Sequence, residues 1–215
     1  MSSAAERSVT QEEYRFQYDW FSGNIPVWEE HLARFAGRKD LTFIEIGSWE
    51  GRSAVWLLEN ILTDESCTLH CIDPWASPIG NTIEAHFDHN MEVVRPRSKA
   101  RLVKHKGWST DILPAFGKES ADFIYVDGSH VAKDVLSDIV LAWRLLSPGG
   151  VMICDDYELE QGIEFHEGYE TFPVVPPLER PKPAIDAFLH CFEGDYRILF
   201  KRWQVLMEKV PDPRS

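Results

Sequence analysis

Short apolar runs alternate with segments of helical periodicity from Leu41 onward, and this alternation constrains the fold more than any other feature. The first and last intervening segments carry apolar residues at i, i+3, i+4 and i+7, as amphipathic helices do. Strands that alternate with helices predict a parallel sheet covered on both faces. We therefore expect an α/β, doubly wound, Rossmann-like fold. The predicted strands are Thr42 to Ile46, Thr68 to Ile72, Ala100 to Lys104, Ala121 to Val126 and Val151 to Cys154, and the predicted helices are Ala54 to Leu62, Thr82 to Val94, Thr110 to Phe116 and Val131 to Leu146.

The C-terminal part of the pattern breaks this alternation. A helix predicted over Pro183 to Phe192 has Gly194 just past its end, and two strands follow, Tyr196 to Phe200 and Trp203 to Met207. Only Lys201-Arg202 separates them, so the two strands must be antiparallel. The sheet is thus expected to be mostly parallel and to close with a reversed C-terminal β-hairpin.

An aromatic segment precedes the alternating pattern. Thr10, followed by two glutamates, is typical of a helix start, and the segment to Phe35 predicts two short helices. We interpret residues 1–40 as an N-terminal helical extension and residues 41–209 as one domain. The aromatic side chains could wall a substrate pocket, pack across the domain or form a homodimer contact. They are Tyr14, Phe16, Tyr18, Trp20, Phe21 and Trp28.

The overall charge and composition exclude several classes of protein. A formal net charge of −13 argues against a broad nucleic-acid-binding face and favours a small-molecule substrate. No apolar run approaches the roughly 20 residues of a membrane-spanning helix, and no secretion signal is visible. The four cysteines form no CxxC pair and lie near apolar runs, so we expect reduced core residues of a soluble, cytoplasmic protein. They are Cys67, Cys71, Cys154 and Cys191.

Although the protein is acidic overall, one group of basic residues clusters in the sequence. A solvated face around an edge strand is the interpretation that we favour for it. The group contains Arg95, Arg97, Lys99, Arg101, Lys104 and Lys106.

The segment EIGSWEGRS, from Glu45 to Ser53, follows the first predicted strand, where an open α/β sheet binds its ligand. Gly47 and Gly51 let the backbone turn sharply and approach a ligand, and the amides at the start of the next helix can receive a carboxylate. Glu45 can attract an ammonium group, and Ser48 lies inside the turn. The glycine spacing is GxxxG, whereas the dinucleotide fingerprint is GxGxxG, so a nicotinamide enzyme is disfavoured.

Two further segments lie where a nucleoside would bind. Asp73 ends the second strand, and its carboxylate can accept both hydroxyls of a ribose, although a turn before Pro74 would explain it equally well. Trp75 could cover an adenine edge. After the third strand, Gly107, Trp108 and Ser109 offer an aromatic ring and a hydroxyl to adenine, while Ser109 is also a good helix cap.

These spaced segments resemble those of class I S-adenosylmethionine-dependent methyltransferases. Within that class the chain resembles the small-molecule O-methyltransferases, which include the macrocin and novobiocin sugar methyltransferases and, more distantly, catechol O-methyltransferase. The resemblance covers about residues 41–209. It implies the class I fold, S-adenosylmethionine as the cofactor and methyl transfer to a hydroxyl, as in natural product biosynthesis. It also implies that Glu45, Gly47, Ser53, Asp73, Trp108 and Ser109 line the cofactor site.

Three aspartates follow the fourth and fifth predicted strands, in DFIYVDGSH and VMICDDY. Asp127, Asp155 and Asp156 should therefore lie close together, where they would repel one another unless a cation neutralises them or one is protonated. Oxygen ligands suit Mg²⁺, which would lower the pKa of an acceptor hydroxyl and orient it. The resemblance implies the same three metal ligands. The alternative is that each aspartate caps a turn.

His130 falls where some of the resembling proteins keep a lysine base. A histidine with a near-neutral pKa is suited to take the hydroxyl proton, so we predict His130 and Asp127 as catalytic residues. A helix cap or a solvent-exposed side chain is the alternative for His130.

Residues 157–182 form a long acidic, aromatic and proline-rich segment without periodicity. A loop of this length is typical of a lid or a substrate-binding loop. A metal-independent or N-directed methyltransferase, and a cofactor-binding subunit without catalysis, are the competing hypotheses.

Overall fold

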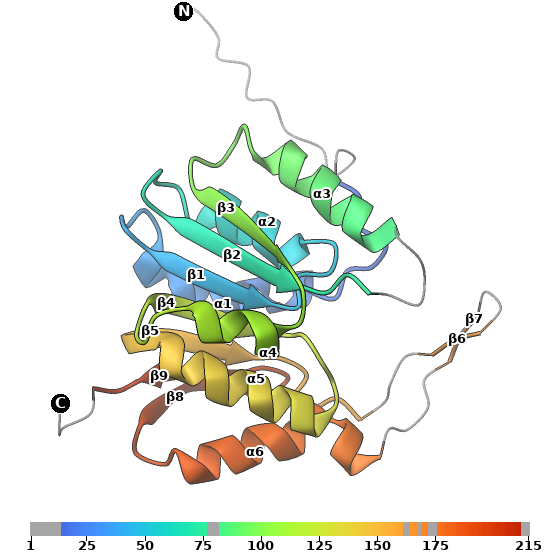
Figure 1. Cartoon of the computed structure of the whole chain (residues 1–215), viewed down its shortest axis with the longest axis vertical. Coiled ribbons are helices and arrows are strands. Elements are labelled where there is room, and N and C mark those ends of the chain that lie inside the picture. The colour runs from blue at the N-terminus through green and yellow to red at the C-terminus, as the bar shows by residue number, and fades with distance from the viewer. Residues whose placement is uncertain (1–13, 77–81, 161–163, 167–168, 172–175, 212–215) are drawn as a thin grey trace, which may run out of the picture.

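The computed structural model describes residues 14–76, 82–160, 164–166, 169–171 and 176–211. Its main feature is a seven-stranded sheet of order β3-β2-β1-β4-β5-β9-β8 (Figure 1). The strands β1 to β5 are parallel, whereas β9 runs antiparallel to both β5 and β8. This confirms the doubly wound sheet with a reversed C-terminal hairpin. The strands are β1 (Thr42–Ile46), β2 (Thr68–Asp73), β3 (Arg101–Lys106), β4 (Ala121–Val126), β5 (Leu146–Cys154), β8 (Tyr196–Lys201) and β9 (Val205–Lys209).

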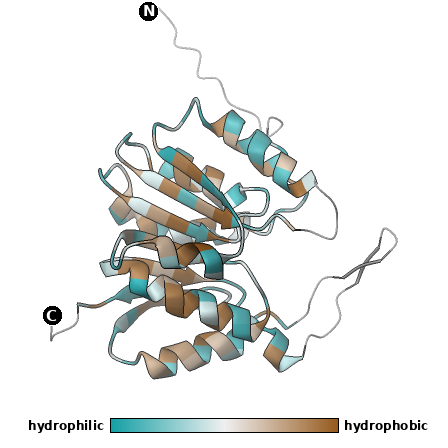
Figure 2. Cartoon of the chain, viewed as in Figure 1, coloured by the Kyte–Doolittle hydropathy of each residue, from teal (hydrophilic) through white to brown (hydrophobic). Residues whose placement is uncertain are grey.

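Helices cover both faces of this sheet because successive strand side chains point to opposite sides. In β1, Phe43 joins the core beneath α1, α2 and α3, whereas Ile44 joins the core beneath α5 and α6. In Figure 2 the strands carry much brown, and α3 is mostly teal on the side that faces away from the sheet. The helices are α1 (Ile25–Leu32), α2 (Arg52–Asn60), α3 (Thr82–Val94), α4 (Ser109–Ile112), α5 (Ala132–Leu145) and α6 (Pro181–Cys191).

The structure corrects several predicted boundaries. The helix predicted over Thr110 to Phe116 is the single turn α4 followed by a 3₁₀ turn at Leu113–Ala115, because Pro114 cannot continue the amide ladder. β9 begins at Val205, so Trp203 lies in the hairpin turn with 42% of its surface exposed. Cys191, at the end of α6, is exposed, while the other three cysteines are buried as expected, and all four are free thiols.

The aromatic lead-in packs into the domain core. Its one described α-helix, α1, lies between 3₁₀ turns at Ser22–Asn24 and Ala33–Phe35, and the first expected helix begins at Thr10, outside the described residues. Phe21 and Trp28 are buried with Phe43 beneath the sheet. Packing across the domain therefore accounts for these two aromatics, and the homodimer contact stays a prediction.

The predicted lid contains a two-stranded hairpin, β6 (Glu164–His166) with β7 (Tyr169–Thr171). It projects away from the sheet in Figure 1. No helix among the described residues is long and apolar enough to cross a membrane.

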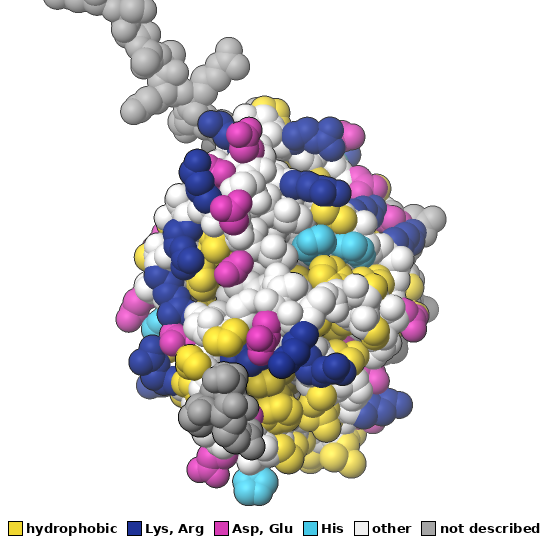
Figure 3. Space-filling model, turned by 60° about the vertical axis from the view of Figure 1, so that its left-hand side comes forward, with side chains coloured by type: hydrophobic (Ala, Val, Ile, Leu, Met, Phe, Trp, Pro, Cys, Tyr) yellow, Lys and Arg dark blue, Asp and Glu magenta, His cyan; other side chains and the backbone are white. Residues whose placement is uncertain are grey.

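The basic group lies on and before the edge strand β3, as expected. Lys104 forms ion pairs with Glu84 and Asp88 of α3, and Lys106 pairs with Glu84. In the space-filling view, Lys and Arg side chains alternate with Asp and Glu (Figure 3). Such interspersed charge does not form a continuous phosphate-binding surface.

Candidate active site

The loops that follow β1, β4 and β5 begin at the same edge of the sheet. Backbone amides extend the strand ladders by one residue: Gly47 N donates to Ile72 O at 2.9 Å, and Asp127 N donates to Ile46 O at 2.8 Å. Asp155 N likewise donates to Val126 O at 3.0 Å. Side chains immediately beyond these three strands are therefore held near one another.

The glycine turn after β1 is forced by close packing. Gly47 has φ +85°, and a Cβ there would lie 1.9 Å from the Asp127 carbonyl oxygen. Gly51 has φ +80° before the first turn of α2, and a Cβ there would lie 2.9 Å from the Phe87 ring of α3. Only glycine fits at position 47, so the turn brings β1 directly against the loop that carries Asp127, and the positive φ favours glycine at position 51.

Glu45 is fully buried beneath this turn. The Ser53 hydroxyl donates to its Oε1 at 2.5 Å, but its Oε2 and the Ser48 hydroxyl make no hydrogen bond within the described part of the chain. Burial raises the pKa of Glu45 to about 7, against the opposing effect of the Ser53 hydroxyl. An unpaired buried carboxylate oxygen needs a donor, and a ligand ammonium would satisfy it.

Asp73 connects the end of β2 to the glycine turn through hydrogen bonds. Its Oδ2 accepts amide hydrogen bonds from Ser48 at 3.0 Å and Trp49 at 2.9 Å, and its Oδ1 accepts one from Trp75 at 2.6 Å. The turn-forming role is thus present, and Oδ1 keeps acceptor capacity for a further donor. Trp75 is 6% exposed, packs against the Phe87 ring at a tilted angle and donates to the Trp49 carbonyl, so the core contains most of its surface.

The segment after β3 presents one exposed ring and one paired hydroxyl. Trp108 is 62% exposed at the start of α4, whereas the Ser109 hydroxyl donates to Asp138 of α5. Trp108 is the N-cap residue of α4 and Ser109 is its first helical residue, so Ser109 does not occupy the cap position. Burial raises the pKa of Asp138 to about 6, against the opposing effect of this hydroxyl.

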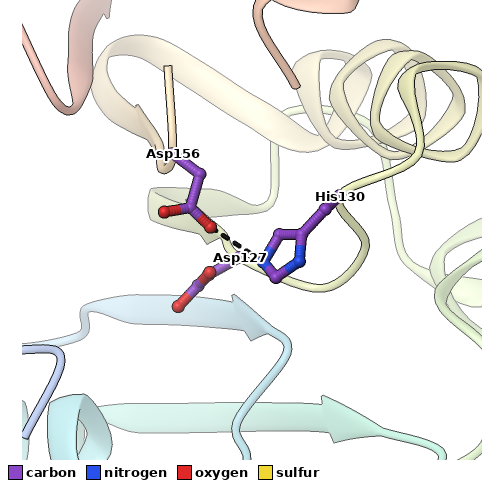
Figure 4. Close-up of side chains that lie close together, drawn as sticks. All are labelled: Asp127, His130 and Asp156. Carbon is purple, nitrogen blue, oxygen red and sulfur yellow. Dashed lines mark ion pairs between the residues drawn. The ribbon is translucent and has the colours of Figure 1, made fainter. Parts of the chain in front are cut away.

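A carboxylate–histidine cluster stands at the ends of β4 and β5. Ligand atoms of Asp127, His130 and Asp156 all lie within 4.8 Å of one another (Figure 4). The His130 Nε2 atom is 2.8 Å from Asp156 Oδ2, and this ion pair raises the pKa of the imidazole. The His130 side chain is 58% exposed, so its ring is accessible to a ligand.

Asp155 is turned away from this cluster, which differs from the predicted set of three metal ligands. It is 8% exposed, and its Oδ1 accepts the Asp156 amide at 2.7 Å. Its Oδ2 accepts from the Tyr125 hydroxyl and, at 2.9 Å, from Gln204 Nε2. Burial raises the pKa of Asp155 to about 6, and burial together with the charges of Asp155 and Asp156 raises that of Asp127.

Comparison with known families identifies the chain. The model of the family described as "Methyltransferase domain" matches residues 44–157, more than half of the chain. The chain belongs to this family. Its sheet has the parallel order and the reversed C-terminal hairpin of the class I methyltransferase fold, and an open α/β sheet binds its ligands at the carboxyl edge.

Similar proteins agree with this assignment at the level of the fold. An O-methyltransferase described as putative, from Klebsiella pneumoniae, is 14% identical, with 91% of this chain and 84% of that chain covered and a TM-score of 0.61. The O-methyltransferase TomG of Streptomyces achromogenes, solved with S-adenosylmethionine, is 17% identical, with 79% and 73% covered and a TM-score of 0.54. An uncharacterized protein of Acanthamoeba polyphaga mimivirus is 27% identical over 131 residues, which are 60% of this chain and 57% of that protein.

Sequence reasoning missed several polar residues that shape the methyltransferase site. Tyr125 lies two residues before Asp127 on the same strand face, and this spacing was the available signal. Gln204 and Trp28 lie 176 residues apart, and no local pattern connects them. Glu50, 2% exposed, accepts the Gln17 amide at 2.7 Å and contacts His86, which ties the lead-in to the glycine turn.

Proposed function

We propose that this methyltransferase transfers the methyl group of S-adenosylmethionine to a hydroxyl of a small molecule, with His130 accepting the hydroxyl proton. The convergence of Asp127, His130 and Asp156 at the carboxyl edge carries the proposal. The O-methyltransferase descriptions of the two structural neighbours support an oxygen acceptor. The resemblance to sugar and phenol methyltransferases favours acceptors of those two classes.

The proposed step needs a base beside the acceptor oxygen. As the oxygen forms its bond to the methyl carbon, the carbon–sulfur bond breaks and the sulfonium leaves as neutral S-adenosylhomocysteine. The hydroxyl proton passes to the exposed His130 imidazole. Asp156 stabilises the resulting imidazolium, because its carboxylate lies 2.8 Å from Nε2.

The cofactor residues fit S-adenosylmethionine. Glu45 Oε2, which has no donor among the described residues, would accept the ammonium of the methionine end. Asp73 would receive a ribose hydroxyl at Oδ1, and the exposed Trp108 ring would cover adenine. Calorimetry should therefore detect binding of S-adenosylhomocysteine but not NAD, and absence of the former binding would defeat the cofactor assignment.

A divalent cation such as Mg²⁺ fits the carboxylates of Asp127 and Asp156, whose mutual repulsion it would relieve. It would make the acceptor hydroxyl more acidic. The metal-independent enzyme is the second candidate, because the His130–Asp156 ion pair already compensates one carboxylate. Loss of methyl transfer on chelation with EDTA, with recovery on added Mg²⁺, is expected. Full activity in EDTA would favour the metal-independent route.

Substitution of the base tests the acid–base assignment. His130→Asn should lower kcat on a panel of sugars and phenols by roughly 100-fold or more, with the KM for S-adenosylmethionine unchanged. His190→Asn, at an exposed position on α6, is the matched control and should retain the wild-type kcat. A His130→Asn variant with wild-type kcat would show that the proton goes elsewhere.

A further inference from the structure

A chain of buried polar contacts runs from the lead-in helix to the catalytic cluster. The Trp28 indole Nε1 donates to Gln204 Oε1 at 2.9 Å, and Gln204 Nε2 donates to Asp155 Oδ2 at 2.9 Å. The Tyr125 hydroxyl lies between Asp155 and Asp127, 2.9 Å from Asp127 Oδ2. Trp28 is fully buried and Gln204 is 1% exposed, so water does not replace these contacts.

The donors and acceptors along this series of hydrogen bonds allow only one orientation of the Gln204 side-chain amide. An indole N–H can only donate, and an ionised carboxylate can only accept. The Gln204 amide must therefore point its oxygen at Trp28 and its nitrogen at Asp155. Without the indole N–H, Asp155 alone orients the amide, and the Gln204 oxygen becomes a buried acceptor that has lost its Trp28 donor.

The chain ends on a residue of the proposed reaction centre. Asp155 accepts from the Asp156 amide and Gln204 and shares the single Tyr125 hydroxyl proton with Asp127, so it cannot reorient without breaking buried bonds. Tyr125 is held in turn by edge-to-face packing on the Trp28 ring, at 4.9 Å between centroids and 87° between planes. Trp28 thus contacts both Gln204 and Tyr125, the two side chains whose polar groups hold Asp155 Oδ2.

We propose that Trp28 and Gln204 are positioning residues for methyl transfer, which fix Asp155 and, through the Tyr125 hydroxyl, hold the Asp127 carboxylate toward His130. This inference rests on the proposed function. It assigns Asp155 a supporting role, and it makes the lead-in helix part of the catalytic apparatus. Residues that orient an active-site group through one intervening partner commonly change activity by roughly 10- to 100-fold when removed.

Two conservative variants test the proposal. Trp28→Phe removes the indole N–H but keeps an aromatic ring, and Gln204→Met removes both amide contacts at similar volume. Trp143→Phe is the matched control, because Trp143 is 4% exposed and packs on Phe188 in the opposite core. On an acceptor from the sugar and phenol panel, both variants should lose roughly 10- to 100-fold in kcat, with the KM for S-adenosylmethionine unchanged. Trp143→Phe should keep its kcat, whatever its loss of thermal stability.

A spectroscopic measurement makes the test independent of the acceptor. In the complex with S-adenosylhomocysteine, the buried Tyr125 hydroxyl proton should give an NMR signal that Tyr125→Phe removes. Trp28→Phe and Gln204→Met should shift or abolish that signal, and Trp143→Phe should leave it in place. An unshifted signal or wild-type kcat in both variants, or an equal loss of kcat in Trp143→Phe, would overturn the positioning role. Shifted signals in an enzyme that methylates no hydroxyl would instead count against the proposed function alone.

Discussion

At the scale of single residues, the glycine turn shows why a position can be required by the protein itself. The sequence predicted that Gly47 and Gly51 let a ligand approach, but the atoms that a Cβ would meet at these positions belong to the Asp127 backbone and to α3. The left-handed φ and the close contact act together at Gly47. The turn leaves no room for a side chain at Gly47. Packing within the protein therefore fixes the backbone conformation of the turn before any ligand binds.

Gly47→Ala should therefore lower the free energy of unfolding much more than an alanine substitution at a glycine that has the left-handed φ but no close neighbour. The overlap with the Asp127 carbonyl and the positive φ should together lower the free energy of unfolding by at least about 3 kcal/mol. Gly37→Ala is the control, because Gly37 has φ +71° and nothing within 4 Å, and it should cost about 1 kcal/mol. Urea denaturation measures both, and equal losses would refute the steric explanation.

Glu45 should make the stability of the protein without cofactor depend on pH. Burial raises its folded-state pKa to about 7 from an ordinary value of 4.5, so the folded state binds a proton that the unfolded state has released. Stability should fall as the pH rises through that window, by at most about 3 kcal/mol in all. Glu45→Gln, which cannot ionise, should lack this component.

The comparison is made by urea unfolding of the two proteins at about pH 4 and about pH 8, on either side of the window. The free energy of unfolding of Glu45→Gln should rise relative to that of the wild type at the higher pH. If the free energy of unfolding changes by the same amount between the two pH values in both proteins, Glu45 does not have the raised pKa.

At the scale of elements, local pattern predicted most of the helices and strands, because spacing and chain breakers act within a few residues. The bounds of β1, β4 and α3 match the predicted ones. The exceptions have local or contextual causes: Pro114 ends α4 early, and Gln204 turns inward toward Asp155, which leaves Trp203 in the hairpin turn. The lead-in was harder to predict, since its backbone bonds go to side chains of distant elements.

Asn90 of α3 should hold the aromatic lead-in against the domain. Its fully buried amide accepts the Arg15 N–H at 2.7 Å and donates to the Arg15 carbonyl at 2.9 Å, as a neighbouring strand would. Asn90→Ala should lower the free energy of unfolding by about 2 to 4 kcal/mol, because it leaves partly buried backbone groups unpaired. It should also speed hydrogen exchange at the Arg15 amide.

Asn60→Ala provides the matched control, because Asn60 donates to the Trp56 carbonyl on the exposed end of α2. It should change stability by no more than about 0.5 kcal/mol. Unchanged exchange at Arg15 in Asn90→Ala would show that other contacts hold the lead-in.

At the scale of the whole molecule, the sheet order follows from the alternation of elements, whereas the site depends on contacts across the chain. Asp127 and Asp156 could be predicted as neighbours because parallel strands end at one edge. The exclusion of Asp155 from the cluster could not, since its partners Tyr125 and Gln204 come from β4 and the reversed hairpin. Single-sequence patterns encode spacing, and they do not encode which buried donor meets which acceptor.

The reversal of β9 has a consequence for the order in which a growing chain becomes functional. Because β9 runs antiparallel to β5, its first residue pairs with Cys154 and places Gln204 beside Asp155. A chain emerging from the ribosome presents the glycine turn and Asp127 long before Gln204 is synthesised. An unfinished chain therefore contains the residues of the glycine turn early, whereas Asp155 gains its Gln204 contact only when the hairpin has formed.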